Sequence, residues 1–111
     1  MDLSLTTHDD GGAVVLGVSG EVDVYSAPAL GERINELLDG GQRRVVVDLN
    51  AVEFIDSTGL GTLVGGHNRA GELGGQLRLV CTVDRVIKLM RITGLDDVFT
   101  ISPSVSAALV D

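Results

Sequence analysis

The sequence has few of the features that mark nucleic-acid binders, disulfide-bonded proteins and membrane proteins. Basic residues are scarce, with 8 Lys and Arg against 16 Asp and Glu and a net charge of -8, which repels a phosphate backbone and argues against nucleic acid as a partner. The single cysteine, Cys81, cannot form an internal disulfide, and its apolar neighbours predict a buried, reduced thiol. No apolar run reaches the roughly 18 residues of a membrane helix, and the first ten residues do not form a secretion signal. We therefore expect a cytoplasmic protein that enters no membrane.

Aromatic residues are also rare, at 3% with no tryptophan, whereas 44% of the 111 residues are hydrophobic. This composition predicts a single domain spanning residues 1–111 with a core of Val, Leu, Ile and Ala. The acidic excess is local, because residues 1–60 hold 11 acids and 3 bases while residues 61–111 hold 5 of each.

The first half of the chain predicts two strands, a helix and a third strand. Apolar residues alternate on either side of a turn signal at residues 9–12, which indicates an N-terminal hairpin. A helical repeat then begins near Ser26 and Pro28 and stops at Gly40. The run at residues 45–47 is apolar without alternation, as in a strand that is covered on both faces.

The second half continues the alternation of helices and strands. Residues 57 to about 73 predict a helix, in which Gly65 and Gly66 would permit close approach to the sheet. A strand at 76–81 and a helix from about 83 to Gly94 follow, then a short edge strand at 98–101 and a last helix opened by Ser102. Such an order predicts an α/β domain with a mixed sheet of four to five strands, an N-terminal hairpin and about four helices.

The stretch DSTGLG at residues 56–61 lies where a strand gives way to a helix. Segments 20–26 and 56–59 both leave the carboxyl edge of the predicted sheet, where ligands and partners gather. Asp56 or Ser57 could simply cap the helix, but capping does not explain the neighbouring hydroxyl of Thr58 or the glycines at 59 and 61. An open serine at a helix N-terminus is a group that another enzyme could phosphorylate.

Self-contained catalysis finds little support in the sequence. Ser57 lacks the glycine that a G-x-S-x-G nucleophile elbow requires two residues before it, and His67 would lie about 15 Å further along the same helix. DSTGLG also lacks the lysine of a phosphate-binding loop, and no Cys or His cluster has metal-ligand spacing. We expect no catalytic residue, metal or cofactor.

The chain resembles the anti-anti-sigma factors, the bacterial anti-sigma factor antagonists built on the STAS fold. The resemblance runs from Leu3 to the last helix, through GEVDVYSAP at 20–28, VVVDL at 45–49, FIDSTGLGTLVG at 54–65, LRLVC at 77–81 and RITGLDDVF at 91–99. It implies that the unphosphorylated form binds an anti-sigma factor, which is a serine kinase of the histidine-kinase-like ATPase class, and thereby frees a sigma factor.

The resemblance also implies roles for individual residues. The family's phosphorylated serine maps to Ser57, and a serine phosphatase would restore activity. The implied partner surface comprises Asp23, Asp56, Ser57, Thr58, Gly59 and Gly61, although Asp23 could instead be a turn or cap residue.

Three alternatives remain at this level. A STAS-type module could sense a nucleotide or small ligand at a shallow site made by the exposed glycines and the strand ends. A hydrolytic enzyme would need a base near Ser57. The stripe of Arg85, Lys88 and Arg91 could be a solvated helix face or could meet an acidic partner.

Overall fold

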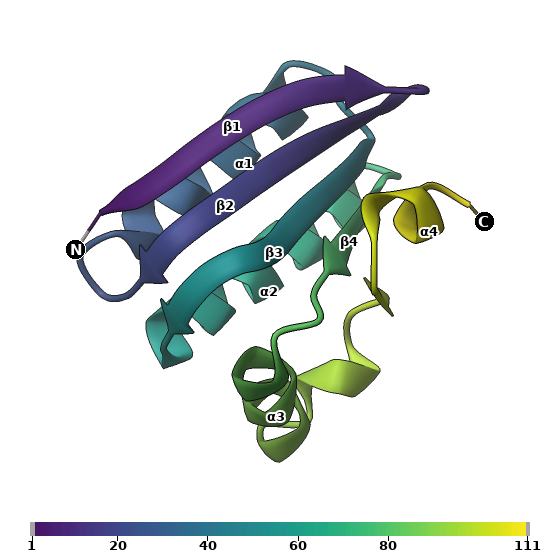
Figure 1. Ribbon diagram of the computed structural model, residues 1–111. Helices are drawn as coiled ribbons and strands as arrows, with labels where there is room; N and C mark the ends of the chain where they lie inside the picture. Colours follow the sequence, from purple (N-terminus) through teal and green to yellow (C-terminus); the bar gives the residue numbers. More distant parts are fainter. Residues whose placement is uncertain (1, 111) are drawn as a thin grey trace.

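The computed structural model describes residues 2–110, which form a five-stranded mixed sheet flanked by helices (Figure 1). The strands are β1 (Leu3–Asp10), β2 (Ala13–Val22), β3 (Arg44–Ile55), β4 (Gln76–Val80) and β5 (Ile101–Ser102). The helices are α1 (Ala27–Asp39), α2 (Ser57–Glu72), α3 (Asp84–Ile92), α4 (Val105–Leu109) and a short 3-10 helix at Leu95–Asp97. The predicted α/β class and element order are confirmed.

The strands lie across the sheet in chain order, and β1 pairs antiparallel with β2 while the other neighbours pair parallel. The turn between β1 and β2 is made by Gly11 and Gly12, whose φ angles of 57° and 88° are both left-handed. A two-residue hairpin turn favours such angles, because they match the twist of the strands. The expected N-terminal hairpin is confirmed.

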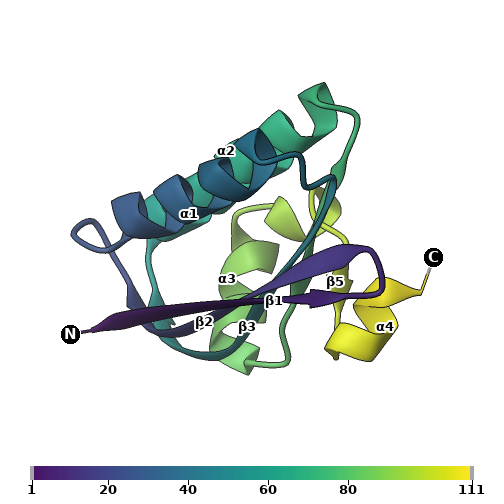
Figure 2. The same cartoon turned by 90° about the horizontal axis from the view of Figure 1, so that it is seen from above.

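Helices α1 and α2 lie side by side over one face of the sheet (Figure 2). Leu16, Leu30, Leu63 and Leu79 are fully buried between these layers. Burial of such a side chain stabilises the fold by roughly 1.5–3 kcal/mol. The core is aliphatic, as the composition predicts.

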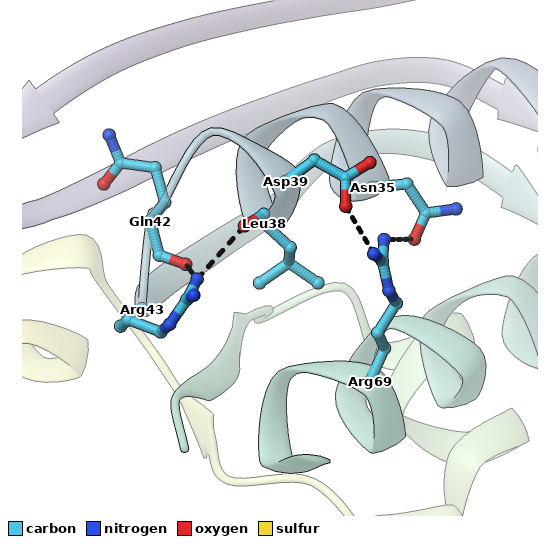
Figure 3. A network of polar contacts seen from close by, with 6 residues as sticks. All are labelled: Asn35, Leu38, Asp39, Gln42, Arg43 and Arg69. Atoms are coloured by element: carbon cyan, nitrogen blue, oxygen red, sulfur yellow. Dashed lines mark hydrogen bonds and ion pairs between the residues drawn. The ribbon is translucent and has the colours of Figure 1, made fainter. Parts of the chain in front are cut away.

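A polar network on the outer surface links α2 to α1 (Figure 3). The Arg69 guanidinium donates to Asn35 Oδ1 at 2.8 Å and pairs with the Asp39 carboxylate. Arg43, just after α1, donates to the Leu38 carbonyl at 3.1 Å and so satisfies a backbone acceptor of the last helical turn. The Arg69 contacts therefore hold the C-terminal half of α2 on α1, whereas the Arg43 contact stabilises the end of α1.

The opposite face of the sheet is covered only in part. Ala108 of α4 packs there against Val15, Val46 and Val80, and Figure 2 shows α4 on the side of the sheet away from α1 and α2. Arg44 Nη2 donates to the Leu109 carbonyl at 3.0 Å and helps to hold α4.

Two predictions near the C-terminus are wrong in their boundaries. The last strand lies at Ile101–Ser102 rather than 98–101, because Phe99 turns inward and buries its ring against His67. The last helix begins at Val105, since the Ser104 hydroxyl, not Ser102, accepts a hydrogen bond from the Ala107 amide at 3.1 Å.

Two further predictions are correct in part. The third strand contains residues 45–47 but extends from Arg44 to Ile55, with irregular register against β2 beyond Gly17. Gly66 does permit close packing, because an added Cβ would lie 3.0 Å from Ile34 Cγ2 and 3.1 Å from Leu77 Cδ1. Gly65 does not, since an added Cβ there would meet open space.

Candidate functional site

The site begins at Asp56, which separates the end of β3 from the start of α2. Its backbone is extended, with φ -106° and ψ -175°, and its Oδ1 accepts a hydrogen bond from the Gly59 amide at 3.0 Å. Its own amide donates to the Val22 carbonyl at 3.1 Å. Asp56 is therefore the helix cap, and it also fastens the start of α2 to the end of β2.

Ser57 is the first residue of α2, and its side chain is exposed. Within residues 2–110, no hydrogen bond engages its hydroxyl. Thr58 beside it is exposed as well, and its carbonyl accepts from Thr62 Oγ1 at 3.1 Å. Two hydroxyl groups thus stand in solvent beside the unpaired amides of a helix N-terminus, where a bound anion is stabilised.

The two glycines of the motif have different environments. Gly59 is buried, and an added Cβ would lie 2.7 Å from both Ile55 Cγ1 and Val22 Cγ1. Gly61 is exposed, with open space where its Cβ would be. Gly59 therefore permits α2 to start against the sheet, whereas Gly61 leaves the surface next to Ser57 free of a side chain.

Asp23 lies in the loop between β2 and α1, at the same edge of the sheet. Its Oδ1 accepts from the amides of Tyr25 at 2.9 Å and Ser26 at 3.0 Å. The bond from the Ser26 amide, aided by that from Tyr25, holds the pKa of the Asp23 carboxyl below its ordinary value despite slight desolvation. Asp23 therefore has the turn role that the sequence also allowed, and its hydrogen bonds order the loop.

The loop and the start of α2 are neighbours, as predicted from the sheet edge. Val22 pairs with Ile55 in the parallel register, and each segment departs directly after that pair. Ser26 Oγ further closes the loop by accepting from the Asp23 amide at 3.0 Å and donating to the Glu21 carbonyl at 2.8 Å.

Sequence reasoning missed three exposed apolar side chains at this edge. Tyr25 is 90% exposed, Val24 55% and Phe54 49%. Phe54 is the first residue of the quoted stretch FIDSTGLGTLVG, in which the sequence pattern gives it no role of its own. Its exposure depends on the irregular pairing of β3, which the periodicity of the sequence does not reveal.

One residue of the basic stripe on α3 contacts the strand that leads to the site. Arg85 is exposed, and its Nη2 donates to the Glu53 carbonyl at 2.7 Å. Lys88 and Arg91 are exposed further along the helix. The structure thus gives Arg85 a contact with the end of β3 and leaves the other two on a solvated face.

No imidazole stands near Ser57 in residues 2–110. His8 pairs with Val15 at the other end of the sheet, and the ring of His67 packs edge-on against Phe99 at 5.4 Å between centroids. His67 Nδ1 is buried without a hydrogen-bond partner. The geometry therefore offers no triad with Ser57.

The described residues contain no group of three or more His, Cys, Asp or Glu that could hold a metal ion. Cys81 is buried, and burial raises the pKa of its thiol. In the same part of the chain, no helix has both the length and the apolar character that a membrane span requires.

Comparison with known proteins adds independent evidence. The STAS domain model matches residues 4–108. The chain is 36% identical to the anti-sigma-B factor antagonist of Bacillus subtilis over 102 residues, which cover 92% of this chain and 93% of that protein. The Staphylococcus aureus anti-sigma-B factor antagonist is 33% identical over 102 residues, which cover 92% of this chain and 94% of the relative.

A solved structure agrees with these relatives. The crystal structure of an anti-sigma factor antagonist from Mycobacterium paratuberculosis superimposes with a TM-score of 0.90 at 31% identity, and covers 97% of this chain and 92% of its own. The chain therefore belongs to the STAS domain family and, within it, to the anti-sigma factor antagonists.

Proposed function

We propose that this chain is a partner-switching protein that acts in the bacterial cytoplasm. Its unphosphorylated form binds an anti-sigma factor, itself a serine kinase of the histidine-kinase-like ATPase class, and a sigma factor is thereby released. Phosphorylation of Ser57 ends the binding. Relatives named as anti-sigma-B factor antagonists support the partner class, and the exposed, unbonded hydroxyl of Ser57 is the observation that carries the switch.

The open setting of Ser57 suits phosphoryl transfer. The Ser57 oxygen forms a bond to the γ-phosphorus of ATP while the bond between that phosphorus and the β-phosphate oxygen breaks, and ADP leaves. The hydroxyl proton passes to a base on the kinase. Such a reaction needs in-line access to the oxygen, which an exposed first helical residue provides and which Gly61 leaves unobstructed.

The free domain should tolerate the phosphate. A helix N-terminus stabilises an anion by roughly 0.3–1 kcal/mol in an exposed setting, while repulsion from Asp56 costs about 1 kcal/mol for charges 4 Å apart in water. The two effects nearly cancel. We therefore expect no loss of fold from a modification that adds about -1.5 to -2 charges.

The complex with the kinase should be destabilised by the phosphate on Ser57. A kinase that has just transferred phosphate still holds ADP opposite Ser57, so the new phosphoserine faces the phosphates of the nucleotide. Once solvent is excluded, repulsion between these charges is several times stronger than in water. Dissociation follows, and a serine phosphatase that hydrolyses the phosphoserine ester to serine and inorganic phosphate restores the binding form.

The remaining residues of the proposed contact surface fall into two groups. Asp56, Thr58 and Gly61 lie close to Ser57 in sequence at the start of α2, and Asp23 lies in the loop at the same edge of the sheet. We propose that these four residues face the partner. Gly59 is buried in the free chain, so its part in the surface is to position Ser57 by close packing.

Substitution of Ser57 tests the proposal. We expect Ser57→Ala to bind the anti-sigma factor kinase as tightly as the unmodified chain and to resist release by ATP, and Ser57→Glu to bind at least about tenfold more weakly. Calorimetric titration gives the affinities, and mass spectrometry after incubation with ATP locates the phosphate. Thr58→Ala is the matched control for the site of modification: it removes the adjacent hydroxyl of the proposed contact surface, but ATP should still release this variant from the kinase as it releases the unmodified chain. Equal affinities for Ser57→Ala and Ser57→Glu would reject the proposal.

A second candidate function draws on a groove away from Ser57. A groove of about 680 Å³ lies between α3 and β5, and its lining includes the polar residues Thr82, Asp84, Arg91 and Ser102. It opens beyond the carboxyl ends of β4 and β5, where α/β sheets bind ligands. Binding of labelled nucleotide to the isolated protein at micromolar affinity, lost in Arg91→Ala, would favour a ligand-sensing module.

A further inference from the structure

We propose that Tyr25 and Phe54, with Val24 beside them, are the apolar anchors by which this chain docks on its kinase, and that the kinase receives them in an apolar pocket rimmed by basic side chains. We call these three residues and the acids around them, Glu21, Asp23, Glu53 and Asp56, the docking edge. The inference rests on the proposed function and deepens it, because it names residues that recognise the partner apart from the residue that is modified.

The docking edge brings together two segments that are distant in sequence. Phe54 is the register partner of Glu21, and the next pair, Val22 and Ile55, ends both strands. The loop with Val24 and Tyr25 leaves from one strand, and α2 with Ser57 leaves from the other. A partner that reaches the Ser57 hydroxyl therefore meets these apolar side chains at the same edge.

Their exposure calls for an explanation. Tyr25 is 90% exposed and Phe54 49%, although aromatic residues make up only 3% of this chain. A large aromatic side chain held in water gains nothing for the fold, whereas at a protein interface it buries area at a low cost in entropy. Two of the chain's few aromatic residues thus stand at the edge that carries Ser57.

The loop is rigid enough to present Tyr25 in one place. The Asp23 carboxylate binds the Tyr25 and Ser26 amides, and the Ser26 hydroxyl bonds back to the Glu21 carbonyl at 2.8 Å. The Ala27 amide also donates to the Asp23 carbonyl at 2.8 Å. A preorganised anchor loses less conformational freedom on binding.

Charge indicates which partner surface fits. Four carboxylates belong to the docking edge, and the base that touches it, Arg85, donates its Nη2 to the Glu53 carbonyl. The half of the chain that supplies the edge carries the whole acidic excess. A basic rim would complement this surface and speed association. In the proposed complex the basic rim lies opposite Glu21, Asp23 and Glu53, while the nucleotide phosphates lie opposite Ser57 and its neighbour Asp56, so the rim does not oppose release on phosphorylation.

The kinetics of phosphorylation by the purified kinase test the inference. We expect Tyr25→Ala and Phe54→Ala each to raise KM for phosphorylation of Ser57 about tenfold or more with kcat nearly unchanged, and to weaken binding to the same extent. Ile92→Ala and Val110→Ala are matched controls, because these side chains are 72% and 73% exposed in other parts of the fold. Both should behave as wild type. Thermal melts should show that all four variants remain folded.

Ionic strength tests the basic rim. The association rate should fall as salt rises, and Glu21→Gln with Glu53→Gln should lower both the rate and its salt dependence. Wild-type KM in Tyr25→Ala and Phe54→Ala would overturn the inference while leaving the Ser57 switch in place. If the unmodified chain binds no kinase of this class, both proposals fall together.

Discussion

The two ends of α2 differ in their surroundings: the N-terminus is exposed to solvent, and the C-terminal half is packed against the sheet and α1. At its N-terminus, Ser57 and Thr58 stand in solvent, and Gly61 leaves the surface around them bare. Toward its C-terminus, Gly66 lets the helix pack closely on Ile34 and Leu77, and Arg69 ties it to α1. One helix is thus anchored at one end and chemically accessible at the other.

This difference explains how a modification can change binding without changing the fold. The groups that hold the C-terminal half of α2 are its apolar contacts and the contacts of Arg69 with Asn35 and Asp39, and none of them includes Ser57. The cap by Asp56 links the stability of the helix start to the site of modification, because it bonds the Gly59 amide and also stands beside the serine. Substitutions that act on only one end of α2 can therefore test whether stability and accessibility are separate properties of the two ends.

The largest effect on stability is expected from the two glycines of the motif. Gly59→Ala places a Cβ 2.7 Å from Val22 Cγ1 and 3.0 Å from the Val22 carbonyl oxygen, so overpacking should lower the free energy of unfolding by about 1–3 kcal/mol. Gly61→Ala has open space around it and should raise that free energy by roughly 0.5–1 kcal/mol through helix propensity. Urea unfolding measures both. Equal effects would mean that the start of α2 is not packed as described.

A smaller effect is expected at the cap. Asp56→Ala removes the acceptor for the Gly59 amide and should cost about 1 kcal/mol of unfolding free energy. Asp56→Asn keeps an acceptor and should cost far less, while removing the charge beside Ser57. Chemical unfolding of both variants distinguishes the contribution of the cap hydrogen bond from that of the negative charge. If Asp56→Asn lost as much unfolding free energy as Asp56→Ala, the charge itself would stabilise the helix start.

The smallest effect is expected at Asp23 and depends on pH. Its pKa is lower in the folded chain, because the Ser26 and Tyr25 amides bond the carboxylate. The resulting stabilisation is fully present above the unfolded pKa of about 3.9 and is lost as the pH falls through the lower folded value. Asp23→Asn should therefore be less stable than wild type at pH 6, and the difference should shrink as the pH falls through the folded pKa of Asp23. A pH-independent difference in urea midpoint would contradict this assignment.

Much of the fold could be predicted from the sequence, because the strands and helices follow simple periodicities. Residues 57–72 form a helix as their spacing predicts, and the hairpin follows from the glycine pair at 11 and 12. The predicted boundary of the last strand was wrong because Phe99 packs into the core against His67, far away in sequence. Local patterns do not contain such tertiary contacts.

The site was predictable to a similar extent. Asp56, Ser57 and Thr58 could be placed at a strand-to-helix junction, and the loop at Asp23 could be placed beside them. The burial of Gly59 could not, because it depends on the side chains of Val22 and Ile55. The exposure of Tyr25 and Phe54 could not be predicted either, since large aromatic side chains are usually expected to be buried.

The most direct test compares the unmodified chain with the chain phosphorylated at Ser57, in both binding to the kinase and thermal unfolding. We predict that phosphorylation weakens binding at least about tenfold while Tm changes by no more than a few degrees, since the two effects of the phosphate on the free domain nearly cancel. Undiminished affinity after phosphorylation, or loss of binding that merely accompanies unfolding, would contradict the account.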